Sequence, residues 1–328
     1  MKKISLDLGS GGKSMRDFIA GTIVPTFQNP VLAELSDAGH LPDKIAFTTD
    51  SYVVDPIFFP GGDIGKLAVN GTVNDLVVSG AEPKYISLAL ILEEGLAWND
   101  LEKILGSLKK AAATAKVQVT TGDTKVVRLG QGDKIYINTS GIGRVIARPR
   151  PDKIRPGDKI IVTGTMGEHS LAILMARGEF GLESHVRSDC APLNFLLPFW
   201  KKGVFWMRDI TRGGLATILS ELAERIPYPI LIEENKVPLS RAVCGASELL
   251  GIDPLYLACE GRAVLVAPEG KACRILDEIK KHPLGRRAQI IGQVEAKTGR
   301  LGELLLRTAA GGLRRLEPLT SELLPRIC

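Results

Sequence analysis

Short β-rich apolar runs alternate with helical stretches along this sequence, and one proline cluster interrupts the alternation. Strands are expected at residues 44–49, 86–92, 117–121 and 135–142, and an amphipathic helix at 100–115. The cluster begins with Arg-Pro-Arg-Pro-Asp at 148–152 and continues to a Pro-Gly turn at 156–157. Prolines at this density end helices and strands alike. The cluster therefore predicts a boundary between two domains.

A second unit of mixed strands and helices is expected after the proline cluster. The pattern predicts a strand at 159–163, a helix at 167–177, a turn and helix at 209–225, and strands at 262–267 and near 290–294. Residues 316–328 contain two prolines and keep no sustained period, which is typical of a tail. A chain of 328 residues exceeds what one core usually supports. We therefore expect an α+β protein with domains at 1–147 and 148–315 and a flexible tail at 316–328.

Charge and apolar content argue against several classes of protein. The 42 basic and 37 acidic residues are scattered, with no run of five or six Lys or Arg, so binding to nucleic acid or to a membrane surface has little support. The longest apolar stretch, 85–92, is far shorter than the roughly 20 residues of a membrane-spanning helix. The N-terminus lacks a signal-peptide core. The five cysteines form no C-x-x-C pair, so we expect a cytoplasmic protein without disulfides.

A glycine-rich loop at residues 9–14, Gly-Ser-Gly-Gly-Lys-Ser, is the first candidate binding element. Glycines let backbone N–H groups approach phosphate closely, and a following helix N-terminus adds a favourable field. The end of the loop fits a Walker A motif, but Asp7 stands where the first glycine is required, so a P-loop fold is not expected. Gly9, Gly11 and Gly12 form either a phosphate-binding loop or a plain flexible turn.

Three aspartates occupy positions suited to a divalent cation. Asp50 and Asp123 stand next to expected strands, and Asp75 lies in the segment 71–76. Carboxylates at strand ends, beside small residues, suit Mg²⁺ held together with nucleotide phosphates. The alternative for each is helix capping or turn formation, the commonest use of aspartate in such places. Lys125, two residues beyond Asp123, offers a cation for a phosphate oxygen or a developing charge.

The second half of the chain contains two further charged candidates. The segment 208–214, Arg-Asp-Ile-Thr-Arg-Gly-Gly, precedes an apolar-periodic helix. Asp209 and Arg212 then lie at a helix start, where an anion site is plausible. The alternative is an N-cap beside a solvated ion pair. Glu260 comes just before the strand expected at 262–267, and an ordinary surface carboxylate is its default interpretation.

The last residue of the sequence, Cys328, is expected to be exposed, free and mobile. A thiolate on a flexible tail can act as a carried nucleophile. The neighbouring Arg326 would lower its pKa, while the adjacent α-carboxylate would raise it. The alternative is a frayed end without function. Prenylation is a poor explanation, because it requires cysteine four residues from the end, where Pro325 stands.

Together these motifs resemble the HypE family of hydrogenase-maturation proteins, within the aminoimidazole-ribonucleotide-synthetase-like ATP-binding superfamily. The resemblance covers the whole chain, because six motifs occur in the family's order. They are the glycine loop, Thr-Thr-Asp, Asn-Asp-Leu, Thr-Gly-Asp-Thr-Lys, Arg-Asp-x-Thr-Arg-Gly-Gly and Glu-Gly. The acidic motifs indicate the superfamily, whose fold selenophosphate synthetase, thiamin-monophosphate kinase and formylglycinamidine synthetase share. The final Pro-Arg-Ile-Cys separates HypE proteins from these siblings.

The resemblance implies a two-domain synthetase-like fold. Its N-terminal domain would form a β-barrel across a homodimer, with flanking helices, its C-terminal domain would be an α/β sandwich, and its tail would enter the ATP site. ATP and Mg²⁺ are the implied cofactors. The implied metal ligands are Asp50, Asp75, Asp123 and Asp209. The implied nucleotide site adds Gly9, Gly11, Gly12, Asp63 and Arg212. The implied catalytic residues are Cys328, Lys125 and Glu260.

The activity that the resemblance implies is ATP-dependent dehydration of a carbamoyl group on the Cys328 sulfur to a thiocyanate. The product would supply cyanide ligands for the iron of NiFe hydrogenase. A carbamoyltransferase, HypF, would load the sulfur, and a HypC–HypD complex would accept the cyanide. Two alternatives remain open. One is a sibling ATP-dependent kinase or synthetase that acts on a free small molecule and does not need Cys328. The other is a nucleotide-binding adaptor without chemistry.

Overall fold

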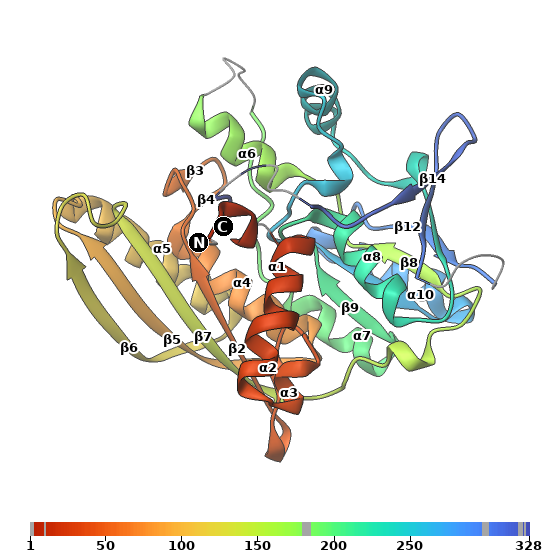
Figure 1. Cartoon of the computed structure of the whole chain (residues 1–328), viewed down its shortest axis with the longest axis horizontal. Coiled ribbons are helices and arrows are strands. Elements are labelled where there is room, and N and C mark those ends of the chain that lie inside the picture. Colours follow the sequence, from red (N-terminus) through yellow and green to blue (C-terminus); the bar gives the residue numbers. More distant parts are fainter. Residues whose placement is uncertain (1–2, 10, 179–184, 297–301, 321–323, 325) are drawn as a thin grey trace.

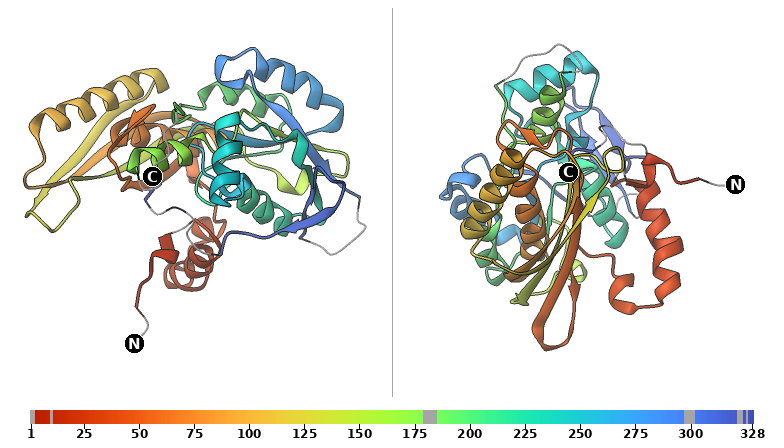
Figure 2. Two further views of the ribbon diagram at one scale, coloured as in Figure 1. Left: turned by 90° about the horizontal axis from the view of Figure 1, so that it is seen from above. Right: turned by 90° about the vertical axis from the view of Figure 1, so that its left-hand side faces the viewer.

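Two β-sheets and the helices packed on them make up most of the structure. The computed structural model of the chain describes residues 3–9, 11–178, 185–296, 302–320, 324 and 326–328. The first sheet lies at one end of the molecule and the second at the other, and a short helical arm near the N-terminus crosses in front of their junction (Figure 1). The described residues that precede the arm project away from the body (Figure 2).

The first sheet has five strands in the order β1-β2-β7-β5-β6. Their bounds are Gly39–His40 (β1), Ile45–Tyr52 (β2), Ala81–Glu93 (β5), Gln118–Val127 (β6) and Ile135–Val145 (β7). Only β5 and β6 run parallel, and helix α5 (Trp98–Ala115) connects them as a crossover. A small separate hairpin pairs β3 (Phe58–Phe59) with β4 (Gly62–Asp63). The strands predicted at 44–49, 86–92, 117–121 and 135–142 and the amphipathic helix at 100–115 are confirmed.

Helix α4 (Ile64–Val78) was not expected, because its sequence is apolar on every side. Thirteen of its 15 residues are buried. A helix without a polar face lacks the 3.6-residue period by which helices are recognised. It begins at the N-cap Asp63, whose side chain accepts hydrogen bonds from the N–H groups of Gly65 and Lys66 at 2.8 and 3.0 Å. Asp75, placed by the sequence only in the segment 71–76, therefore lies in the last turns of this helix.

The second sheet has seven strands in the order β14-β13-β10-β12-β8-β11-β9. Their bounds are Lys159–Val162 (β8), Trp206–Asp209 (β9), Ile230–Glu233 (β10), Ala263–Ala267 (β11), Gln289–Val294 (β12), Leu304–Arg307 (β13) and Leu313–Leu316 (β14). The strands predicted at 159–163, 262–267 and near 290–294 are confirmed. The last of these does not close the domain, because β13 and β14 extend the sheet to Leu316. These two strands have four residues each and contain arginines, so the alternation of apolar and polar residues that predicts a strand is weak in them.

Helices cover both faces of the second sheet. Their bounds are Glu168–Arg177 (α6), Leu197–Lys201 (α7), Gly214–Arg225 (α8), Arg241–Leu250 (α9) and Glu269–Lys280 (α10). Along β8, Ile160 and Val162 pack in the core on the α8 face, and Ile161 packs in the core on the α10 face. This alternation is the period of two that a strand imposes on its side chains. The predicted helix at 167–177 and the turn and helix at 209–225 are confirmed.

A shared core joins the two sheets. Val69 and Val73 of α4 belong to the same buried cluster as Trp200 of α7, Met207 of β9 and Leu265 of β11. Helix α4 also packs against β2, β5 and β7 of the first sheet. The proline cluster at 148–152 thus lies between the two sheets in sequence, while α4 holds them together in space.

The helical arm consists of α1 (Lys13–Phe18), a π-helical turn η2 (Ile19–Ile23), α2 (Val24–Phe27) and α3 (Pro30–Ala33). Its contacts with the second half of the chain are polar. Arg16 pairs with Glu224 of α8 at 2.5 Å, and the Lys13 N–H donates to the carbonyl oxygen of Leu319 at 2.7 Å. The Ser14 hydroxyl donates to the carbonyl oxygen of Thr320 at 3.1 Å. The arm is therefore attached to the segment that follows β14.

Two expectations concern the overall architecture: a β-barrel formed across a homodimer, which a single chain does not test, and a free chain end. The first sheet is open, so the described residues of a single chain form no closed barrel. The end of the chain is packed rather than free: Ile327 is 6% exposed and belongs to a core cluster with Tyr52 and Val54. Backbone hydrogen bonds and burial of one isoleucine hold this end, and neither produces a period in the sequence.

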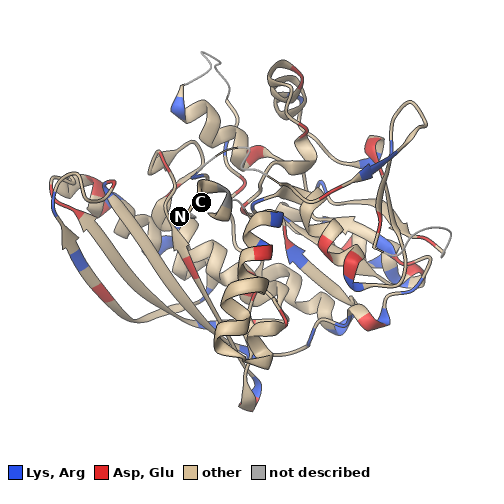
Figure 3. Cartoon of the chain, viewed as in Figure 1, with Lys and Arg blue, Asp and Glu red and all other residues tan. Residues whose placement is uncertain are grey.

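Basic and acidic residues are interspersed over both halves of the chain (Figure 3). Among the described residues, no helix combines the length and the apolarity needed to cross a bilayer. All five cysteines are free.

We predict that Asn74→Ala destabilises the whole molecule by about 2–4 kcal/mol. The Asn74 amide donates to the carbonyl oxygens of Ala191 and Glu260 at 3.2 and 3.3 Å and accepts from the Leu193 N–H at 2.8 Å. The substitution removes this partner from the buried Leu193 N–H and the Ala191 carbonyl oxygen, whereas the Glu260 carbonyl oxygen keeps its bond from the Ala191 N–H at 3.3 Å. Chemical denaturation measures the change, with Gln118→Ala on the exposed strand β6 as the control. An equal effect of both substitutions would contradict the assigned role.

Candidate functional site

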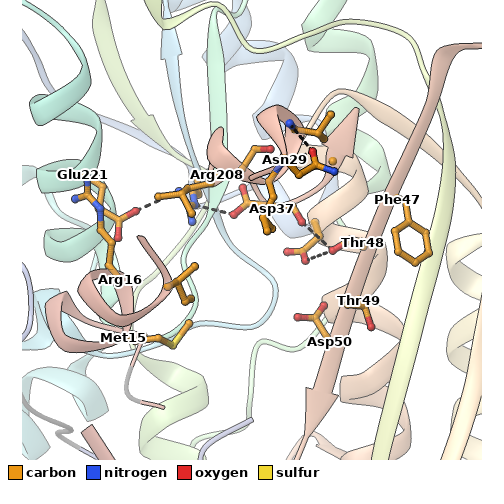
Figure 4. A pocket seen from close by; sticks show the side chains of 18 of the residues that line it. Met15, Arg16, Asn29, Asp37, Phe47, Thr48, Thr49, Asp50, Arg208 and Glu221 are labelled. Atoms are coloured by element: carbon orange, nitrogen blue, oxygen red, sulfur yellow. Dashed lines mark hydrogen bonds and ion pairs between the residues drawn. The ribbon is translucent and has the colours of Figure 1, made fainter. Parts of the chain in front are cut away.

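A cavity of about 610 Å³ lies between the helical arm, β2 and α8. That volume suits a ligand of small-molecule size. Its apolar wall consists of Met15, Ile19, Val31, Leu32, Leu35, Leu41 and Phe47. Its polar side includes Thr48, Thr49 and Asp50 of β2 (Figure 4). The cavity thus offers an apolar wall for a flat or aliphatic group and a carboxylate-rich side for a cation or charged group.

Three carboxylates from separate parts of the chain converge beside this cavity. Oxygen atoms of Asp37, Asp75 and Asp209 lie within 4.8 Å of one another. They come from the segment before β1, from α4 and from the end of β9. The Thr48 hydroxyl lies 2.9 Å from a carboxylate oxygen of Asp75. Oxygen ligands gathered in this way suit a hard divalent cation.

Burial and mutual repulsion change the proton affinity of these acids. Burial raises the pKa of Asp75 well above its ordinary value, and the charges of Asp50, Asp209 and Asp37 raise it further. Burial, together with Asp37 and against the opposing effect of Arg208, raises the pKa of Asp209 to about 8. Burial also raises the pKa of Asp50, against hydrogen bonds that favour its charged form. The cluster therefore holds protons at neutral pH that a bound cation would displace.

Arg208 partly compensates the negative charge. Its guanidinium pairs with Asp37 at 2.8 Å and with Glu221 of α8 at 3.2 Å, and it lies between these two carboxylates (Figure 4). The charge of Asp37 is thereby held at a fixed place in the cavity wall. One guanidinium shared with Glu221 does not neutralise Asp50, Asp75 and Asp209.

Glu260 is a buried acid next to this cluster. It is 3% exposed, and within the described part of the chain its Oε1 atom has no hydrogen-bond partner. Burial raises its pKa well above the ordinary value, and the charges of Asp209 and Asp189 raise it further, while Arg212 lowers it. The expectation of an ordinary surface carboxylate is wrong. A buried, incompletely bonded carboxyl group is instead suited to proton transfer.

Arg212 connects the end of the chain to the acidic residues. The charge of Cys328 is the strongest influence on the pKa of Arg212 and raises it, and Glu260 and Asp50 raise it further against the effect of burial. The Arg212 guanidinium also donates to the carbonyl oxygen of Gly9 at 2.5 Å. The last residue, the glycine loop and the acid cluster therefore meet at one arginine.

Two domain descriptions match this chain. Residues 35–145 match the AIR synthase related protein, N-terminal domain, and residues 155–302 match the AIR synthase related protein, C-terminal domain. Carbamoyl dehydratase HypE of Rhodobacter capsulatus is 44% identical over 338 residues, which cover 100% of this chain and 98% of that relative. The chain belongs to the HypE family. Its fold agrees with that of other HypE proteins.

Two crystal structures of HypE proteins illustrate the agreement. The structure of hydrogenase maturation protein HypE in complex with ATP is 44% identical, with a TM-score of 0.83 over 99% of this chain and 100% of that chain. The structure of a HypE–HypF complex is 39% identical, with a TM-score of 0.87 over 92% of this chain and 99% of that chain.

Several residues predicted from the HypE resemblance do come together in the structure. Gly11, Gly12, Asp50 and Asp75 line the cavity. Asp209 joins the carboxylate cluster. Asp50 lies within β2 rather than after it. Gly9 lies outside the cavity wall and accepts the hydrogen bond from Arg212 described above.

The glycine loop approaches other parts of the chain closely. A Cβ atom on Gly12 would lie 2.1 Å from the carbonyl oxygen of Leu319. Gly11 has φ +74°, and a Cβ atom there would lie 2.4 Å from the Cβ of Arg212. Contact with the tail and with Arg212 therefore requires glycine at these two positions, whatever the loop also does toward phosphate.

Asp63, Asp123 and Lys125 are not brought to the cavity within one chain. Asp63 caps α4, as described above. Asp123 lies within β6 rather than after it, and its carboxylate pairs with the Lys125 ammonium at 2.7 Å in an exposed position. The strand β6 lies at the outer edge of the first sheet, away from α8 (Figure 1).

Sequence reasoning missed two site residues, Asp37 and Glu221. Asp37 stands in Leu-Ser-Asp-Ala-Gly at 35–39, which looks like an ordinary turn. Glu221 lies on the polar side of α8, where a solvated glutamate is the usual case. Both residues pair with Arg208 and line the cavity, and Asp37 also joins the carboxylate cluster; all of these contacts depend on the fold.

We predict that Mg²⁺ stabilises the protein more at about pH 8.5 than at about pH 6. An acid whose pKa is raised on folding binds more protons in the folded state. Its contribution to stability therefore falls as pH rises from about 4 toward the pKa of about 8 of Asp209. A cation replaces those protons.

Thermal denaturation with and without Mg²⁺ at both pH values measures the effect. Asp209→Asn should remove most of the stabilisation by Mg²⁺, and Asp123→Asn serves as the control. Equal increases in melting temperature with Mg²⁺ at both pH values would count against the prediction.

Proposed function

We propose that this protein uses ATP to dehydrate a carbamoyl group carried on the Cys328 sulfur to a thiocyanate, which supplies cyanide ligands for the iron of NiFe hydrogenase. The observation that carries the proposal is the position of Cys328 at the end of β2, the strand that contains Asp50: its backbone oxygen accepts from the Val53 N–H at 3.0 Å, and it packs against the cluster that contains Tyr52. A sibling kinase acting on a free small molecule has no need for its last residue at this place. The names of the relatives, carbamoyl dehydratase HypE, support the same activity.

The reaction balances without a further reactant. The carbamoyl oxygen attacks the γ-phosphorus of ATP, and ADP leaves. The C–O bond then breaks with phosphate as the leaving group, and the nitrogen loses its two protons, so that S–C(=O)–NH₂ and ATP become S–C≡N, ADP and phosphate. Phosphoryl transfer of this kind depends mainly on positioning and on neutralisation of charge.

Glu260 is the residue proposed to take a proton from the carbamoyl nitrogen. Its pKa, raised well above the ordinary value by burial, and its unpaired oxygen suit a group that exchanges protons with a substrate. Arg212 is proposed to hold the terminal residue and to stabilise charge on the transferred phosphoryl group. The apolar wall of the cavity, which contains Met15 and Phe47, is proposed to receive the adenine ring.

Mg²⁺ fits the acid cluster. Asp37, Asp75 and Asp209 would hold it with help from Asp50, because these oxygens are close together and their charge is incompletely neutralised. When bound, it would neutralise charge on the phosphates of ATP.

Two copies of the chain are proposed to associate through the uncovered face of the first sheet. Phe47, Ile142 and Tyr85 occupy paired positions on three neighbouring strands, and all three are more than 40% exposed. An apolar row of this kind is a liability unless a partner covers it. Phe47 also lines the cavity, so a partner on this face would border the site.

Asp123 and Lys125 are proposed to reach the site of the second copy. In the sheet, Lys125 pairs with Ile91, which is 43% exposed, and Asp123 pairs with Ala89, two residues earlier on the same strand. Side chains two residues apart lie on one face of a strand. Asp123 and Lys125 therefore share the uncovered face with Tyr85, at which the second copy is proposed to bind.

HypF and a HypC–HypD complex are the proposed partners. The structure of a related HypE bound to HypF supports the first of these. In this proposal HypF loads the carbamoyl group onto Cys328, and HypC–HypD accepts the cyanide for iron.

We predict that Cys328→Ala abolishes formation of the thiocyanate while leaving the affinity for ATP within about twofold, because the thiol carries the reacting group but does not line the cavity. Mass spectrometry of the C-terminal peptide after incubation with ATP, Mg²⁺, carbamoyl phosphate and HypF detects the product. Cys273→Ala, at an exposed cysteine of α10, is the matched control. ADP release that persists without Cys328 would favour the sibling kinase, and absence of turnover in the wild type would favour the adaptor.

We predict that mixing inactive Lys125→Ala and Asp75→Asn chains restores about a quarter of wild-type activity. If Lys125 acts on the second copy, each mixed dimer contains one site with both substitutions and one intact site. Half of a statistical mixture is mixed dimers. If Lys125 instead acts within its own chain, every site carries one substitution and the mixture stays inactive. Light scattering establishes that the dimers form.

A further inference from the structure

The last three residues of the chain lie in a groove that holds the backbone oxygen of each. The carbonyl oxygen of Arg326 accepts from the Asp55 N–H at 3.1 Å and from the Arg177 guanidinium at 3.0 Å. The backbone oxygen of Cys328 accepts from the Val53 N–H at 3.0 Å. Val53 and Asp55 follow β2 in the first half of the chain, and Arg177 ends α6 in the second half. Both halves therefore contribute donors to this groove.

The middle oxygen is held by a fully buried histidine. The Nε2 atom of His169, in the first turn of α6, lies 2.6 Å from the carbonyl oxygen of Ile327. A carbonyl oxygen only accepts, so Nε2 carries the proton. The Nδ1 atom must then accept from the Ser188 hydroxyl at 2.7 Å, and the Ser188 oxygen accepts in turn from the Cys190 N–H at 3.1 Å. This series of bonds fixes one neutral tautomer of His169 and aims its proton at the chain end.

Side-chain contacts set the position of the terminal residues along the groove. Ile327 packs in a buried cluster with Val54, Ile57 and Ile173. The Arg326 side chain donates to the carbonyl oxygen of Val53 at 2.9 Å and pairs with Asp133. A shift by one residue would place an arginine in the apolar cluster, so the contacts specify one register.

We propose that this groove is a receptor for the C-terminal tripeptide and that His169 is the positioning residue that fixes Cys328 at the end of β2. Ile327 precedes Cys328 directly, so the bond to its carbonyl oxygen sets where the next side chain begins. Arg177 holds the preceding carbonyl and acts as a second positioning residue. The proposal rests on the proposed function only in assigning chemistry to Cys328, since docking itself requires no reaction.

The test compares alkylation of Cys328 with alkylation of Cys273, the exposed cysteine of α10, in the full-length protein. We expect His169→Ala to raise the Cys328:Cys273 rate ratio about tenfold, the effect of losing one hydrogen bond in a buried groove. His169→Gln keeps an N–H donor and should restore most of the difference. Arg177→Ala should raise the ratio as well.

Two further measurements separate positioning from general loss of structure. Cys190 and Cys259 are buried and should stay unreactive in every variant. With the loaded thiol, His169→Ala should lower kcat about tenfold and leave the KM for ATP within about twofold. An unchanged Cys328:Cys273 ratio in both His169→Ala and Arg177→Ala would overturn the proposal. A raised ratio in a protein that never forms thiocyanate would uphold the groove and refute the proposed function.

Discussion

Repulsion between carboxylates held together away from water is the constraint on which this structure depends. Asp37, Asp75 and Asp209 are brought within a few ångströms by three elements that are far apart in sequence. Such a cluster is unfavourable unless it is protonated or meets a cation, so the surrounding fold must hold it in place. Helix α4 does this for Asp75, because it is buried between the two sheets and has no freedom to turn its carboxylate outward. The result is a site already arranged for a cation and for the phosphates that accompany it.

The N-terminal arm and the C-terminal residues pack beside the acid cluster and complete its surroundings. The arm encloses the apolar side of the cavity, and the terminal residues are held at the end of β2, the strand that contains Asp50. In the proposed function the thiol is loaded by another protein, so the tail must leave the groove and return. The observed contacts suit a reversible arrangement, because they consist of a few hydrogen bonds and one buried isoleucine rather than a large apolar interface. A groove that held the tail more tightly would slow its loading.

Much of the fold could be predicted from the sequence, and the parts that could not share a physical reason. Strands such as β2 and β7 alternate between a buried and an exposed face, so their period is visible. Helix α4 has no exposed face. Its sequence therefore lacks the 3.6-residue alternation of apolar and polar residues by which a helix is predicted. The acids of the site were found where short motifs contain them, as with Asp50 and Asp209. Asp37 lies in no motif, and its role follows from its proximity to Asp75 and Asp209 and its pairing with Arg208, which only the fold creates. The packed chain end was missed because backbone oxygens, which every residue has, form most of its contacts.

The bonds between the arm and the segment after β14 also constrain the order of events during synthesis. Ser14 and Thr320, which share a hydrogen bond, are separated by 306 positions in the sequence. The separation between Val53 and Cys328, which also share a hydrogen bond, is nearly as large. Contacts between such distant positions are the last that a growing chain can make, because one partner does not exist until translation is nearly finished. The residues that line the cavity all precede residue 226, but the bonds that attach the arm to the segment after β14 form only once residues 319 and 320 are present. The finished fold thus holds its N-terminal arm by contacts that a chain lacking residues 319 and 320 cannot make.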